Sequence, residues 1–182
     1  MKIHHLGIIE KCKKNDRRSQ LKLYNLYCDA MYNVAYRFMK NSQDAEDAMQ
    51  MAFIKAFKKI ETYKGEVSFG AWLKKIVVHT SIDMLKSVKM NFTDVDDNYL
   101  NVVSDDDWEI EDGISIEEIK SAISQLPQKY ELVVSLFLIE GYDHSEIASI
   151  LNISEVNSRT QLLRGKKKLK ESLKQFSNGT GS

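Results

Sequence analysis

The chain has 182 residues, 43% of them hydrophobic, and its 26 Lys and Arg balance 26 Asp and Glu. This length corresponds to one domain or two small ones, and no stretch approaches the roughly 18 apolar residues of a membrane span. The N-terminus has too short an apolar stretch for a signal peptide, so we expect a cytoplasmic protein. Two cysteines without metal-type spacing exclude a disulfide framework and give no reason to expect a metal or cofactor.

The zero net charge conceals three blocks of different charge. Residues 1–90 hold 17 basic and 9 acidic residues, residues 91–112 hold nine acids and no base, and residues 113–182 hold 9 basic and 8 acidic residues. A run of like charge repels itself and often forms a tether. The pattern predicts a domain over 1–90, an acidic linker over 91–112, a second domain over 113–176 and a tail over 177–182.

The first block has the periodicity of helices. The spacing predicts one helix over 16–40, a second from about 43, a loop over 63–67 and a third helix capped by Ser68. The apolar stripes that we expect to be buried are Leu21, Tyr24, Leu26, Ala30, Met31, Val34, Ala35 and Phe38 in the first helix, Met51, Phe53, Ile54, Phe57 and Ile60 in the second, and Trp72, Leu73, Ile76, Val77, Thr80 and Met84 in the third.

The second block also reads as helices, each with a start or stop signal. Ser115 and Glu118 have the spacing of a capping box, Pro127 suits a first helical turn, and Gly141 suits a helix end. No strand-like alternation is long enough to build a sheet. We therefore predict an all-α protein with two small helical domains.

Residues 141–169 predict a helix-turn-helix. Asp143 and Glu146 can form a capping box at the start of a short helix. Asn152 tolerates the positive φ of a tight turn, and Ser154 is a good N-cap for the next helix. That second helix is rich in Lys and Arg, so it can hold DNA phosphates by charge.

Residue types predict which face of this second helix is buried and which contacts DNA. We expect the inner stripe to consist of Val156, Thr160, Leu163 and Leu169. Asn, Gln and Arg read base edges, and Lys contacts phosphates without reading sequence. The residues that we expect to contact DNA are Ser154, Asn157, Ser158, Arg159, Gln161, Leu162, Arg164, Lys166, Lys167 and Lys168.

Taken together, the two blocks resemble a bacterial sigma factor of the small, two-domain, extracytoplasmic-function (ECF) type. The resemblance spans nearly all of residues 20–174. It rests on Asp44-Ala45-Glu46-Asp47 followed by Gln50, Phe53, Ala56 and Phe57, on Tyr63-Lys64-Gly65, Ser68-Phe69 and Ala71-Trp72-Leu73, and on Leu126-Pro127 and Gly141-Tyr142. The first domain is similar to sigma region two and the second to region four.

The resemblance implies a function and a set of partners. Members of this family give core RNA polymerase its choice of promoter and perform no bond chemistry, so we expect no enzyme activity. The implied partners are the clamp helices of the largest core subunit, the flap of the second subunit, promoter DNA and an anti-sigma factor. The implied core-binding residues are Asp44, Asp47 and Gln50.

The resemblance also implies where DNA binds. The loop at Tyr63 and Lys64 would receive a flipped base of the minus-ten element, with Tyr63 as a stacking face, and Lys74, Lys75 and His79 would line the non-template strand. The helix after Ser154 would read the minus-thirty-five element.

Three alternatives stay open. The chain could be a stand-alone helix-turn-helix regulator, which would leave the acidic helix at 44–47 and the loop at 63–67 without a role. Trp72 could be a core anchor or a base contact. The acidic linker could mimic a nucleic-acid strand in a basic channel, or act only as a solubilising tether.

Overall fold

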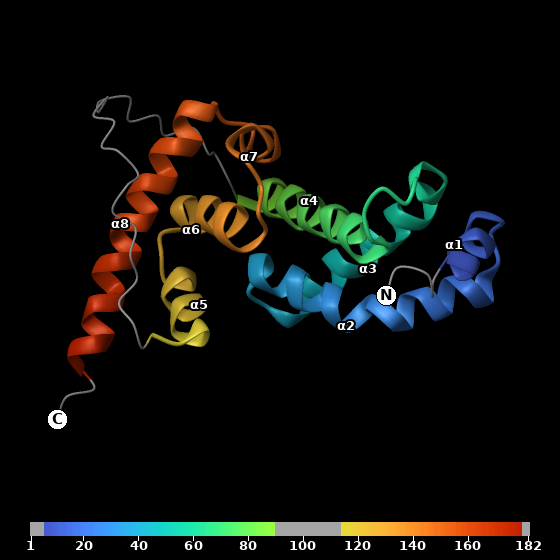
Figure 1. The fold of residues 1–182 in the computed structure, drawn as a ribbon, viewed down its shortest axis with the longest axis horizontal. Coiled ribbons are helices and arrows are strands. Elements are labelled where there is room, and N and C mark those ends of the chain that lie inside the picture. Colours follow the sequence, from blue (N-terminus) through green and yellow to red (C-terminus); the bar gives the residue numbers. More distant parts are fainter. Residues whose placement is uncertain (1–5, 90–113, 180–182) are drawn as a thin grey trace. The chain divides into compact units, whose positions relative to one another are not determined.

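The computed structural model describes residues 6–89 and 114–179, and it divides into two compact units, residues 1–90 and 91–182 (Figure 1). The described ranges contain helices and turns and no β-strand, so the predicted all-α class is confirmed. None of their helices is long and apolar enough to cross a membrane. The acidic linker lies outside the described residues, and both of its interpretations remain predictions.

Over residues 6–89, the first unit contains four α-helices and one short 3-10 turn. Three helices have the predicted positions, whereas the helix at the N-terminus was not predicted. Asp16 caps the second helix and Asn41 caps the third, and Lys40 between them takes the left-handed conformation at φ 59°. The elements are α1 (Leu6–Lys13), α2 (Arg17–Met39), α3 (Ser42–Lys58), η1 (Ile60–Thr62) and α4 (Phe69–Lys89).

Helices α2, α3 and α4 pack against one another around a common core. The buried face of α3 carries four alanines, which allow its neighbours to approach closely: Ala45, Ala48, Ala52 and Ala56. In α2 the buried stripe passes through Leu23, and the predicted members Leu21 and Leu26 are 60% and 53% exposed. The helix was predicted at the right position, but part of its predicted buried face is exposed.

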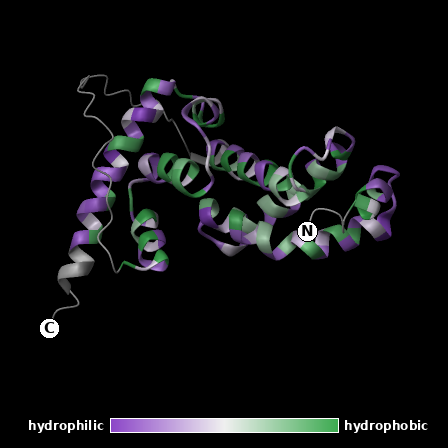
Figure 2. Cartoon of the chain, in the orientation of Figure 1, coloured by the Kyte–Doolittle hydropathy of each residue, from purple (hydrophilic) through white to green (hydrophobic). Residues whose placement is uncertain are grey.

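The second unit is organised around one long helix, α8 (Glu155–Gly179), which packs against α5 (Ile116–Ser124), α6 (Gln128–Val134) and α7 (His144–Leu151). Between α6 and α7 the chain forms a π-helical segment, η2 (Ser135–Ile139). Figure 2 shows α8 as mostly hydrophilic along its length, with short hydrophobic segments. Both predicted capping boxes, at the starts of α5 and α7, are confirmed.

At Gly165, α8 lies close to α6. A Cβ at this position would lie 2.6 Å from Cγ2 of Val134 and 3.3 Å from Cβ of Tyr130. A glycine inside a helix costs about 1 kcal/mol relative to Ala. At this position the glycine allows α8 and α6 to pack closely, because any larger residue would displace the buried Val134 side chain.

Candidate nucleic-acid interface

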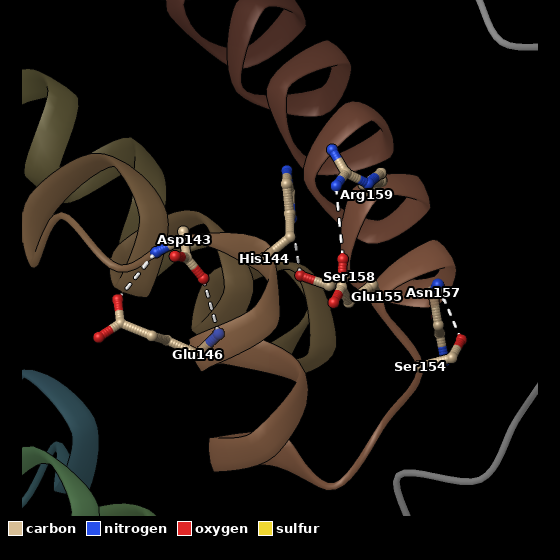
Figure 3. A network of polar contacts seen from close by, with 8 residues as sticks. All are labelled: Asp143, His144, Glu146, Ser154, Glu155, Asn157, Ser158 and Arg159. Atoms are coloured by element: carbon tan, nitrogen blue, oxygen red, sulfur yellow. Dashed lines mark hydrogen bonds and ion pairs between the residues drawn. The ribbon is translucent and has the colours of Figure 1, made fainter.

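The helix-turn-helix formed by α7 and α8 contains the local hydrogen bonds that its sequence predicts (Figure 3). The backbone N–H of Glu146 donates to Oδ1 of Asp143 at 2.8 Å, and the Asp143 N–H donates to Oε2 of Glu146 at 3.2 Å. Asn152 ends α7 in the left-handed region at φ 58°. The N–H of Asn157 then donates to Oγ of Ser154 at 3.1 Å, so the predicted cap of α8 is confirmed.

A polar pair that the sequence did not reveal joins the two helices of the motif. Nδ1 of His144 lies 2.9 Å from Oγ of Ser158, and the His144 ring stacks on Phe137 with centroids 4.9 Å apart (Figure 3). Ser158 is fully buried. A serine has little bulk, so α7 and α8 can come close while both polar atoms stay hydrogen-bonded.

The inner face of α8 differs from the predicted one. Of the predicted stripe, Leu169 is buried, but Val156 is 63% exposed, and Thr160 and Leu163 are only half-buried. The observed buried face repeats every three to four residues: Ser158, Leu162, Gly165, Leu169 and Leu173. The prediction chose Val156 and Leu163 for the inner face and placed Leu162 outside, whereas in the structure Leu162 is buried and a serine and a glycine make the close contacts.

Because the buried face of α8 differs from the predicted one, four of the residues predicted to contact DNA do not lie on the surface. Ser158 and Leu162 face the core, and Gln161 is buried while its Nε2 donates to Oδ1 of Asn157 at 2.8 Å. Lys166 is also buried, with its Nζ 5.9 Å from the centre of the Phe137 ring. We therefore correct the prediction for Ser158, Gln161, Leu162 and Lys166.

The outward surface of α8 keeps the other predicted residues. Arg159 is exposed, and its Nη2 lies 3.5 Å from Oε2 of Glu155 (Figure 3). An exposed pair of this kind contributes only about 0.3–0.5 kcal/mol, so the guanidinium can exchange Glu155 for another acceptor at little cost. The remaining predicted residues are exposed or half-buried: Ser154, Asn157, Arg164, Lys167 and Lys168.

The loop between η1 and α4 is closed by Tyr63. Its Oη donates to the carbonyl oxygen of Val67 at 2.8 Å, and its ring packs edge-on against Phe69 with centroids 5.5 Å apart. Tyr63 is only 7% exposed, so the expected open stacking face is not present. Gly65 takes φ 79°, a backbone conformation that side chains with a Cβ rarely adopt. Together the two residues fix the shape of the loop.

The other residues of the first unit that were predicted to contact DNA differ in their exposure. Lys64, Lys75 and His79 are exposed, and Lys74 is half-buried. Trp72 is half-buried against Tyr63 with ring centroids 5.4 Å apart, so both interpretations of Trp72 remain open. Val67 is half exposed at the loop, and the sequence had not singled it out.

The predicted core-binding residues share the outer face of α3. Asp44, Asp47 and Gln50 are all exposed, and Nε2 of Gln50 donates to Oε1 of Glu46 at 3.0 Å. The same side of the helix carries two apolar residues that we had expected to be buried: Met51 and Ile54, 47% and 49% exposed. Residues at i, i+3, i+4 and i+7 lie on one helix face. The face therefore combines carboxylates with apolar surface.

The titratable groups that shift in the second unit lie at structural positions. Burial raises the pKa of Tyr142 to about 12, assisted by Glu140 and Glu146, so its phenol stays protonated at neutral pH. Hydrogen bonds from Ser115 lower the pKa of Glu118 in its capping box. In the parts of the chain that the structure describes, no three His, Cys, Asp or Glu side chains are grouped as metal ligands. The chemistry of these surfaces is recognition through charge, amides and apolar contacts.

An all-helical fold in two units, one carrying a helix-turn-helix with a basic second helix, defines a DNA-binding transcription factor. Residues 23–89 match the model for sigma-70 region 2, and residues 116–169 match that for sigma-70 region 4. The chain belongs to the ECF sigma factors, which direct promoter-specific transcription by RNA polymerase.

Individual relatives agree with this assignment over most of their length. The chain is 29% identical to the ECF RNA polymerase sigma factor SigW of Bacillus subtilis, covering 91% of this chain and 95% of the relative. It is 27% identical to SigM of the same species, covering 82% and 91%. The fold resembles that of the sigma factor RpoE in its complex with the anti-sigma factor NepR from Bartonella quintana, with a TM-score of 0.52, 19% identity, and coverage of 84% and 95%.

Proposed function

We propose that the chain binds core RNA polymerase and places it on promoters through two contacts, with the first unit at the minus-ten element and the second at the minus-thirty-five element. The match to regions 2 and 4, in that order along one chain, carries the proposal. In this proposal, residues 1–90 serve core binding and promoter melting, residues 91–112 form a linker, residues 113–176 serve upstream recognition, and residues 177–182 are a tail. Such a protein acts in the cytoplasm and catalyses no bond chemistry.

The outer face of α3 is the proposed contact with the clamp helices of the largest core subunit. Asp44 and Asp47 supply negative charge, and Gln50 supplies an amide. Met51 and Ile54 add apolar area that gains free energy when it leaves water. Charge complementarity then sets the approach and register, while apolar burial supplies affinity. The flap of the second subunit is the proposed partner of the second unit.

The outward surface of α8 is the proposed reader of the minus-thirty-five element. Arg159 can donate two hydrogen bonds to a guanine, and Asn157 offers an amide. Val156, exposed beside them, suits contact with a thymine methyl group. Arg164, Lys167 and Lys168 bind phosphates, which position the helix without reading sequence. This set replaces the predicted one, from which four buried residues have been removed.

The loop between η1 and α4 is the proposed minus-ten contact. Tyr63 acts as a support that holds the loop, and Lys64 at the exposed loop binds a phosphate. Lys74, Lys75 and His79 on α4 continue this contact along the non-template strand. Flipping a base costs a few kcal/mol, so a loop that is already shaped for the DNA lowers the total cost of melting.

An anti-sigma factor is a further proposed partner. One solved structure with a similar fold is the sigma factor RpoE bound to the anti-sigma factor NepR, and another is CnrH bound to the cytosolic domain of CnrY. The exposed Met51 and Ile54 on α3 give such a partner an apolar surface that core polymerase would otherwise use. Binding of the inhibitor and of core would then exclude each other.

Run-off transcription with purified core polymerase tests the proposal. Promoters obtained by in-vitro selection should be transcribed only when the chain is added, and scrambled promoters should stay silent. A pull-down with core provides the control against a stand-alone regulator. A chain that binds duplex DNA by itself but never binds core would exclude the sigma function.

A further inference from the structure

Helix α1 precedes the part of the chain that matches region 2, which begins at residue 23. It packs against α2 and η1 and is anchored by Ile9 and Cys12, both buried. Burial raises the pKa of the Cys12 thiol, so this side chain stays neutral as a core residue. The helix is therefore a fixed part of the first unit, and its outer residues are held in position.

The outer surface of α1 and of the first turns of α2 is strongly basic. We call this surface the N-terminal basic patch, and its exposed members are Lys11, Lys14, Arg17, Arg18 and Lys22. Figure 2 shows the turn between the two helices as hydrophilic.

The two acids of this segment, Glu10 and Asp16, each have a partner and are fewer than the basic residues of the patch. Oε1 of Glu10 accepts from Nζ of Lys13 at 2.9 Å, and Asp16 accepts from the N–H of Ser19 at 3.0 Å as the cap of α2. Hydrogen bonds from the Ser19 side chain and then from its backbone N–H lower the pKa of Asp16, with smaller contributions from the charges of Lys11 and Arg18. Within the described ranges, Lys14 and Arg17 form no ion pair.

The patch borders the loop between η1 and α4. Helix α1 contacts η1, and η1 runs directly into Tyr63 and Lys64. Lys13 confirms the proximity: its pKa is raised first by its hydrogen bond to Glu10 and further by Glu61 and Tyr63. The patch, with its excess of basic over acidic side chains, therefore lies on a helix that contacts the element leading into this loop.

We propose that the N-terminal basic patch binds the phosphodiester backbone of promoter DNA next to the minus-ten loop. The position of the site rests on the proposed function, whereas the chemistry rests on the charge alone. Phosphate contacts by Lys and Arg release counterions, so they add affinity that falls steeply with salt. They also fix the register of the strand without reading its sequence. The patch thus extends the minus-ten contact beyond the loop itself.

A paired substitution separates this role from folding. Lys14→Gln with Arg17→Gln removes two charges that form no ion pair, and it leaves Lys11 and Arg18, which lie near the cap of α2, unchanged. The matched control is Lys120→Gln with Lys129→Gln, two exposed lysines of the second unit. Circular dichroism should give the same helical signal and melting temperature for wild type, variant and control.

The measurement is the salt dependence of DNA binding by the full-length chain. Fluorescence anisotropy gives the binding constant for a short labelled single strand and for the matching duplex over a range of KCl. Each phosphate contact contributes about 0.7 to the slope of log K against log salt for single strands and about 0.9 for duplex DNA. The Lys14/Arg17 variant should therefore lower the slope by about 1.4 or about 1.8, depending on the form bound, and the control should not.

The outcomes separate this inference from the proposed function. A loss of slope with either form of DNA supports the patch, and the form affected identifies the strand state. If the variant and the wild type have equal slopes with both forms of DNA, the proposal is overturned. The same result is expected if the patch binds an acidic protein in place of DNA. If the wild type transcribes selected promoters with core polymerase while the slopes stay unchanged, only the patch is refuted. If it does not transcribe but the variant loses slope, the patch stands and the sigma function fails.

Discussion

The contact between α6 and α8 at Gly165 gives the sharpest test of how the second unit is packed. Gly165→Ala introduces one methyl group inside α8. Considered as a helix position alone, the change should stabilise the protein, because Ala is favoured over Gly by about 0.8–1 kcal/mol in a helix interior. The surroundings oppose this gain, since the new Cβ would lie 2.6 Å from Cγ2 of Val134.

The expected net effect follows from these two terms. Val134 is fully buried, and a β-branched side chain in a helix has one strongly preferred rotamer, so it cannot turn away easily. Overpacking of this kind costs about 1–3 kcal/mol. After subtracting the helix gain, we expect Gly165→Ala to destabilise the second unit by about 1 kcal/mol, which corresponds to about 4–8 °C in melting temperature for a unit of this size.

A double-mutant cycle with Val134→Ala checks the cause. The methyl group that would clash is absent in that background, so Gly165→Ala should become neutral or stabilising even though Val134→Ala is itself destabilising. Urea unfolding of the four proteins, followed by circular dichroism, gives the coupling free energy, which we expect to be about 1–3 kcal/mol. Stabilisation of the wild-type background by Gly165→Ala would refute the close approach of the two helices.

Three further predictions concern the proposed contacts. Arg159→Ala should relax specificity at one base of the minus-thirty-five element at a cost of about 1–3 kcal/mol. Lys167→Gln should instead weaken binding to all promoter sequences alike and lower the salt slope by about 1. Equal behaviour of the two variants across a promoter panel would contradict this division of roles. Tyr63→Phe keeps the ring but removes the hydrogen bond to the loop, so thermal unfolding should show a loss of about 0.5–1.5 kcal/mol, and promoter melting, followed by permanganate footprinting, should decrease; unchanged melting would argue against a supporting role. Asp47→Lys should weaken core binding in a competition assay by about tenfold, or about 1.4 kcal/mol, and Glu61→Lys, which makes the same charge change away from α3, should not.

Much of the fold could be read from the sequence because its helix ends are encoded locally. The box at Asp143 and Glu146, the left-handed turn at Asn152 and the cap at Ser154 each depend on residues within three positions of one another. Side chains of this type hydrogen-bond nearby backbone groups whatever the rest of the chain does. Their positions therefore follow from the sequence without knowledge of the tertiary structure.

The facing of the helices could not be predicted in the same way. In α8 the sequence offers Val156 and Leu163 as apolar residues, and a prediction that follows hydrophobicity turns them inward. The structure instead turns Ser158 and Gly165 inward, because α7 and α6 come close there. The packing of the whole unit decides which small residues contact a neighbouring helix. The periodicity within one helix does not predict these contacts.

The outward position of Val156 also bears on function. Thr160 and Leu163 follow it at i+4 and i+7, so they continue the same helix face. The hydroxyl of Thr160 donates to the carbonyl oxygen of Val156 at 2.9 Å, which leaves this line with little polar capacity of its own. The side chains of Val156, Thr160 and Leu163 form few hydrogen bonds with water. They can instead contact thymine methyl groups in a major groove. Val156, Thr160 and Leu163, which were predicted to be buried, thus form the weakly polar part of the surface that we propose to contact the minus-thirty-five element.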